Sequence, residues 1–135
     1  MRTTAESERA GASPVELLSL ADAVLSGRDD LPSGGWQRSC AVLARQALEA
    51  ALDELWTRRA PDLVHRNARY QVLCLPSYLG DTTAAGRVSL LWWSLTNASR
   101  HHSYELAPTA VELRGWLDDV GAAIEALSRA RSSAR

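Results

Sequence analysis

The densest group of reactive side chains in the sequence lies near position 100. The stretch from Asn97 to Tyr104 includes an amide, a guanidinium, two imidazoles and a phenol. Imidazole has an unperturbed pKa near neutral pH, so His101 and His102 are candidates for proton transfer. The guanidinium of Arg100 can stabilise the extra negative charge of a phosphate in a transition state. These groups suffice to cleave RNA without a metal, with a base that deprotonates the 2′-hydroxyl for attack on the adjacent phosphate.

A structural role explains the same histidines. His102 continues an inward-facing helical row after Ala98, and an inward histidine at a helix end often bonds a backbone carbonyl or a carboxylate. A histidine near a helix C-terminus also complements the helix dipole. The residue types alone therefore leave catalysis and a structural role both open.

Positive charge is concentrated in the middle of the chain. The protein carries 15 basic and 16 acidic residues, a net charge of −1, but residues 58–100 hold six Arg against Asp62 and Asp81. Such a cluster can hold a phosphodiester backbone, or it can balance the acidic helices of the same fold. The candidate nucleic-acid-binding residues are Arg58, Arg59, Arg66, Arg69 and Arg87.

Composition excludes several other classes of protein. All 15 basic residues are Arg, so no Lys is present to form a Schiff base. No apolar run approaches the ~18 residues of a membrane span, and no secretory signal opens the chain. No metal-ligand or phosphate-loop motif is present, so we expect no metal, no cofactor and no membrane partner. Cys40 and Cys74 lie among apolar neighbours, which indicates buried free thiols and a cytoplasmic location.

Hydrophobic spacing and capping signals predict an all-α fold, an up-and-down helical bundle of four to five helices. The 135 residues correspond to one domain. Ser13-Pro14 and the capping box that starts at Thr109 begin two of the helices, and Asp81 caps a helix that runs to about His102. Pro61 separates the longest helix from a third, shorter one that ends near residue 75. We expect a flexible N-terminus over 1–12, a single domain over 13–131 and a frayed tail over 132–135.

Two adjacent tryptophans mark a candidate interface. Trp92 and Trp93 follow one another on a helix, so only one of them can face the core. Trp93 shares a helical stripe with Asn97 and Tyr104. It could anchor an interface, since Trp, Tyr and Arg dominate binding hot spots, or it could lie beneath a neighbouring helix.

The stretch Asn97-x4-His102-x-Tyr104, at the end of a late helix in an all-α chain, resembles the motif of the HEPN superfamily of helical domains. That motif is an Arg, four to six residues and a His, and one toxin branch extends it to Arg-x4-His-x-Tyr. Residues 105–109 and 113–116 look like an actinobacterial subfamily. The resemblance covers most of the chain in its helical architecture.

The resemblance implies a metal-independent endoribonuclease of the stress or toxin type, with His102 as the catalytic histidine. It also implies a homodimer whose two motifs share a cleft, and an antitoxin partner that can modify Tyr104. The Arg of the motif is replaced by Asn97, which carries no charge and cannot clamp a phosphate at two points. Either Arg100 supplies the missing cation, with His101 beside it, or the domain is inactive and binds a protein partner or nucleic acid.

Overall fold

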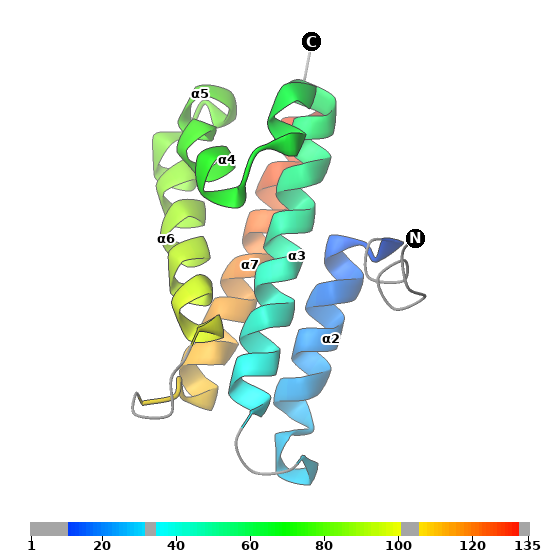
Figure 1. The fold of residues 1–135 in the computed structure, drawn as a ribbon, viewed down its shortest axis with the longest axis vertical. Coiled ribbons are helices and arrows are strands. Elements are labelled where there is room, and N and C mark those ends of the chain that lie inside the picture. Colours follow the sequence, from blue (N-terminus) through cyan, green and yellow to red (C-terminus); the bar gives the residue numbers. More distant parts are fainter. Residues whose placement is uncertain (1–10, 32–34, 101–105, 133–135) are drawn as a thin grey trace.

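The computed structural model describes residues 11–31, 35–100 and 106–132. For residues 131 and 132 only the backbone is described. Within these ranges the chain forms six α-helices and no strand, which confirms the predicted all-α class. Four long helices run alternately down and up the molecule (Figure 1). They are α2 (Pro14–Ser26), α3 (Trp36–Arg59), α6 (Thr82–Ser99) and α7 (Ala110–Ser132).

Side-chain caps begin three of the long helices where the sequence predicts them. The Ser13 hydroxyl accepts the Glu16 N–H at 3.1 Å, and Pro14 occupies the first turn of α2. The Asp81 carboxylate accepts two N–H groups at the start of α6, at 2.9 and 3.1 Å. Thr109 and Glu112 form a reciprocal capping box at the start of α7. These bonds satisfy backbone donors that have no partner inside the helix.

The prediction of a single third helix between residues 62 and 75 is wrong. The chain forms a 3-10 helix, η2 (Pro61–His65), and then begins α4 (Ala68–Cys74) from a new cap at Asn67, whose side chain accepts the Tyr70 N–H at 2.8 Å. A further short helix, α5 (Pro76–Leu79), ends at Gly80, which has a left-handed φ of 69° that suits glycine. The Asn67 cap separates η2 from α4, which the apolar pattern alone would join into one helix.

Other expected boundaries differ less. A short 3-10 helix, η1 (Arg28–Asp30), follows α2, and α6 ends at Ser99 rather than at the predicted His102. The predicted flexible N-terminus and frayed tail lie largely outside the described residues. No helix of the described part is long and apolar enough to cross a membrane.

The core surrounds α3, which lies in the centre of the bundle (Figure 1) and packs against α2, α6 and α7. Alanines on α3 bring the neighbouring helices close, and larger side chains fill the space between these contacts. The fully buried residues of α3 are Cys40, Ala41, Ala44, Ala47, Leu48, Leu52, Leu55 and Trp56. The short helices α4 and α5 cover the end of the bundle that α2 leaves uncovered (Figure 1).

Cys40 packs where α3 contacts α2, and its thiol donates to the Ala21 carbonyl at 3.5 Å. Burial raises the pKa of Cys40 to about 11, so its thiol stays protonated at neutral pH and nucleophilic thiolate is scarce. Cys74 is also a free thiol but is only half-buried.

We therefore expect DTNB at mildly alkaline pH to modify one thiol per native chain and two in urea. A Cys74→Ser variant should show no fast native reaction. Equal native reaction rates at the two cysteines would contradict the burial of Cys40.

Candidate nucleic-acid interface

The predicted reactive stretch lies at the end of α6. Its residues His101, His102 and Tyr104 fall outside the described part of the chain, so the structure places only the residues that lead to them. Asn97 and Arg100 are both exposed and lie about one helical turn apart, so they share the outer side of α6. The motif position that lacks its Arg is therefore open to solvent, with a guanidinium beside it.

The inner side of α6 follows the predicted pattern. Of the predicted inward row that begins at Ala84, the residues Val88, Leu91, Leu95 and Ala98 are buried, and Ala84 is half-buried. Ala98 is the last described member of the row, and the Arg100 N–H then closes the helix on carbonyls of the preceding turn. Packing thus fixes the orientation of the last turn of α6, from which the reactive stretch continues.

The two tryptophans divide between core and surface, as predicted. Trp92 is 8% exposed and Trp93 is 40% exposed. Their rings meet edge to face with centroids 5.0 Å apart. The indole N–H of Trp92 donates to Glu49 Oε1 at 3.1 Å, which links α6 to α3. One tryptophan therefore anchors the helix while its neighbour presents an aromatic face to solvent.

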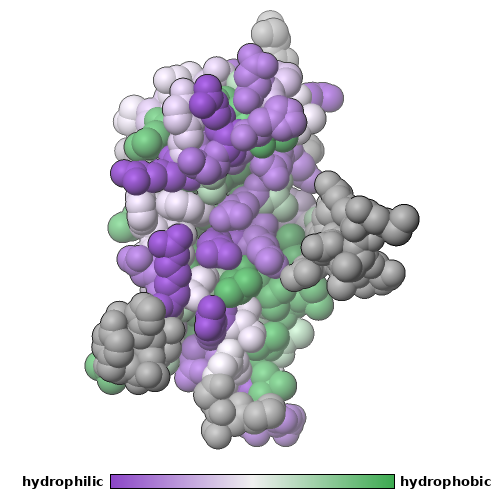
Figure 2. Space-filling view, in the orientation of Figure 1, coloured by the Kyte–Doolittle hydropathy of each residue, from purple (hydrophilic) through white to green (hydrophobic). Residues whose placement is uncertain are grey.

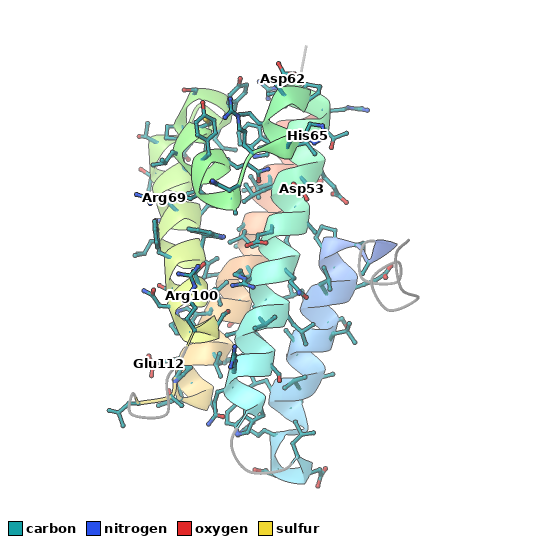
Figure 3. The ribbon with its side chains drawn as sticks, viewed as in Figure 1. Asp53, Asp62, His65, Arg69, Arg100 and Glu112 are labelled. Carbon is teal, nitrogen blue, oxygen red and sulfur yellow. The ribbon has the colours of Figure 1, made fainter. Side chains whose placement is uncertain are left out.

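Arg66, directly after η2, and Arg69, in α4, lie over exposed aromatic rings. The guanidinium carbon of Arg69 lies 5.7 Å from the ring centroid of Trp93, and that of Arg66 lies 4.9 Å from the ring centroid of Tyr70. Such cation–π contacts hold planar cations against aromatic faces. Arg69 and Arg100 both lie along α6 (Figure 3), and we call the surface between and around them the α4/α6 face. It consists of Arg66, Arg69, Tyr70, Trp93, Asn97 and Arg100.

The remaining arginines of the positive segment do not join this face. Arg59 donates from Nη1 to the Ala130 carbonyl at 3.0 Å, and its guanidinium lies 5.8 Å from the ring centroid of Tyr78. Arg58 is exposed in the last turn of α3. The sequence cluster of arginines is therefore distributed over several surfaces of the fold.

Arg87 lines a separate hollow of about 570 Å³ between α6 and α7. Small side chains such as Ala84, Ala122 and Ala126 leave this space open, and Trp116 forms part of its wall. The hollow could not be predicted from the sequence, because it depends on which helices become neighbours. In the described ranges no group of three or more potential metal ligands comes together.

A row of polar residues on α3 was not predicted from the sequence. Arg45 Nε lies 3.7 Å from Glu49 Oε1, and one turn further on Asp53 Oδ1 accepts a weak hydrogen bond from Gln71 at 3.5 Å. Desolvation raises the pKa of Asp53, and the Gln71 hydrogen bond partly offsets this rise. Hydrophilic side chains gather over the seam between α3 and α6 (Figure 2). The spacing of four residues was visible in the sequence, but the partners on α4 and α6 were not.

The bond between Trp92 and Glu49 should stabilise the bundle. We expect Glu49→Leu to lower the free energy of unfolding by about 1–3 kcal/mol, because the buried indole N–H loses its acceptor. Glu49→Gln keeps an oxygen at that position and should cost less than about 1 kcal/mol. Urea unfolding, followed by tryptophan fluorescence, measures both. Equal losses in the two variants would show that the charge, and not the acceptor, is what matters.

Comparison of the chain with models of known families, with curated proteins and with solved structures found no match. The resemblance to the HEPN superfamily therefore stays a prediction that rests on the motif and the helical order.

Proposed function

We propose that the protein binds single-stranded RNA along the α4/α6 face and cleaves it beside the end of α6. The observation that carries this proposal is the pairing of arginines with exposed aromatic rings, Arg69 on Trp93 and Arg66 on Tyr70. Proteins that bind single strands combine a positive track for the phosphates with aromatic platforms for the bases. The face offers both components, and it extends along α6 to Arg100.

The cleavage step follows from the residues that come directly after Arg100. His102 takes the proton of a ribose 2′-hydroxyl, and the oxygen attacks the adjacent phosphorus. The bond from phosphorus to the 5′-oxygen breaks, and that oxygen leaves with a proton from the second imidazole, His101. Arg100 stabilises the charge that develops on the phosphate oxygens. The products are a 2′,3′-cyclic phosphate and a free 5′-hydroxyl, and no metal takes part in this scheme.

A second candidate is binding without cleavage. Asn97 occupies the position of the motif Arg and is exposed without a charge. An amide cannot neutralise a phosphate as a guanidinium does. In this alternative the α4/α6 face retains RNA or a protein partner, and the histidines have no chemical role.

The biological setting of the proposal comes from the resemblance. It includes a homodimer, an antitoxin that acts on Tyr104 and a role as a bacterial stress or toxin effector. The free thiols of Cys40 and Cys74 suit a reducing compartment such as the cytoplasm.

Binding should depend on the α4/α6 face and not on charge in general. We expect Arg69→Gln to weaken binding of a short oligouridylate about tenfold, because it removes a phosphate contact and the cation on Trp93. Arg87→Gln removes the same charge from the hollow between α6 and α7 and should have little effect. Fluorescence anisotropy at moderate salt compares the two variants. Equal losses would indicate a general electrostatic field instead of a defined face.

Cleavage should survive removal of metal ions. We expect purified protein to cut single-stranded RNA in EDTA, and His102→Ala to slow the reaction about a hundredfold or more. His65→Ala is the matched control, because His65 is exposed on η2 and lies far from the end of α6 (Figure 3). Gel electrophoresis and end-group analysis identify the cyclic phosphate. If the wild type binds RNA but leaves it intact, the non-catalytic alternative holds.

A further inference from the structure

The seam between α3 and α6 contains a hydroxyl group that has no partner. Thr96 is 3% exposed, and its Oγ1 makes no hydrogen bond with the described residues. Three other hydroxyls within the helices, those of Thr57, Ser94 and Ser99, donate to the carbonyl four residues earlier at 2.7–3.0 Å. Thr96 does not make this usual bond. A buried hydroxyl without a partner costs free energy, so a ligand group that bonds it would recover that cost.

An arginine with free donors lies at the same level of the seam. The bond between Trp92 and Glu49 sets the register of α6 against α3, and the two helices run in opposite directions (Figure 1). Arg45 lies one turn before Glu49, and Thr96 lies one turn after Trp92, so the two residues lie at the same level of the seam.

The guanidinium of Arg45 is held from one side only. The Arg45 Nε atom lies 3.7 Å from Glu49 Oε1, but this Nε makes no hydrogen bond with the described residues. Its side chain is 26% exposed, so the seam is partly open at this level. Arg45 therefore retains both Nη groups as donors on a planar fork whose position Glu49 restrains.

The available groups are donors, which fits an anion. Arg45 contributes two Nη groups, Thr96 contributes a hydroxyl, and Arg100 lies one turn beyond Thr96 on α6 with an exposed guanidinium. Glu49 accepts the indole N–H of Trp92 and lies beside Arg45 Nε, so the two Nη groups of Arg45 are the donors that remain for a ligand. The α4/α6 face begins next to this point, because Trp93 follows Trp92. An RNA strand with one base stacked on Trp93 can place a neighbouring phosphate in the seam.

We propose that Arg45 and Thr96 form a phosphate site for one phosphodiester of the bound RNA, with Arg100 at its opening. This inference rests on the proposed function and adds a site that the motif does not contain. Arg45 thereby supplies, from α3, a cation that the motif lacks at Asn97. Its role is to bind and position the RNA backbone.

The test uses the full-length protein and a fluorescein-labelled, 2′-O-methylated oligouridylate of about 12 nucleotides, which binds as a single strand but cannot be cut. Thr96→Val keeps the shape of the side chain and removes the hydroxyl. We expect it to weaken RNA binding about fivefold, without loss of stability in urea, because the hydroxyl has no bond to lose in the free protein. Ser94→Ala is the matched control, since its hydroxyl is satisfied by the Leu90 carbonyl.

A second variant separates the guanidinium from the overall charge. Arg45→Gln combined with Glu49→Gln leaves the net charge unchanged and keeps an acceptor for Trp92. We expect it to weaken RNA binding about tenfold and to reduce the salt slope of binding by about 0.7, the value for one phosphate on a single strand. Its control removes the exposed ion pair between Asp22 on α2 and Arg114 on α7, as Asp22→Asn with Arg114→Gln.

The outcomes distinguish this site from the proposed function. If Thr96→Val and the Arg45/Glu49 variant bind RNA like the wild type while Arg69→Gln binds weakly, the α4/α6 face stands and the seam site is overturned. The same binding result with a less stable Thr96→Val protein would show that the hydroxyl holds a structural water only. If the wild type binds no RNA at low salt, both proposals are overturned together.

Discussion

The structure depends on close packing around α3. Alanines at 41, 44 and 47 are fully buried, so neighbouring helices approach this helix without a long side chain between them. Dispersion contacts at such distances are individually weak but numerous. Between the apolar contacts, one side of α3 carries Arg45, Glu49 and Asp53, and this side turns toward the seam with α4 and α6. The helix that holds the bundle together thus also carries the polar row beside the candidate site.

The polar row gives α6 a defined position. Glu49 accepts the Trp92 indole, and this bond sets where the exposed Trp93 emerges at the surface. Arg69 then lies over Trp93 because Asn67 starts α4 at that level. These contacts form a series: the half-buried carboxylate of Glu49 holds the buried indole of Trp92, the exposed indole of Trp93 follows, and the cation of Arg69 lies above it. A binding face built in this way is preorganised, which reduces the entropy lost when a ligand orders it.

Local signals in the sequence predicted most of the fold. Ser13, Asp81 and the Thr109–Glu112 box act within three residues of themselves, so they could be recognised without tertiary information. The rotation of about 100° between adjacent residues of a helix likewise predicted that only one of Trp92 and Trp93 would face the core. The prediction of a single third helix was wrong because the Asn67 side chain caps a new helix within a stretch whose apolar pattern favours one continuous helix.

The candidate site was less accessible to sequence reasoning. Spacing could group arginines along the chain, but only the fold shows that they lie apart. Arg69 lies on the α4/α6 face, Arg59 of α3 bonds to the end of α7, and Arg87 lines the hollow between α6 and α7. The missing bond of Thr96 is invisible in the sequence, because a threonine in a helix ordinarily finds a carbonyl one turn back.

The alanines of α3 also restrict how this protein can diverge. A larger side chain at Ala44 or Ala47 would force two helices apart, and the cost of such overpacking is about 1–3 kcal/mol or more. Exposed positions on α4 and on the outer side of α6 carry no such restriction. Lineages that inherit this scaffold are therefore free to change what its surface recognises, while the interior of α3 stays nearly fixed. Divergence in such a lineage would concentrate at the surface, and a stretch of small residues would be the part of the chain that drifts least.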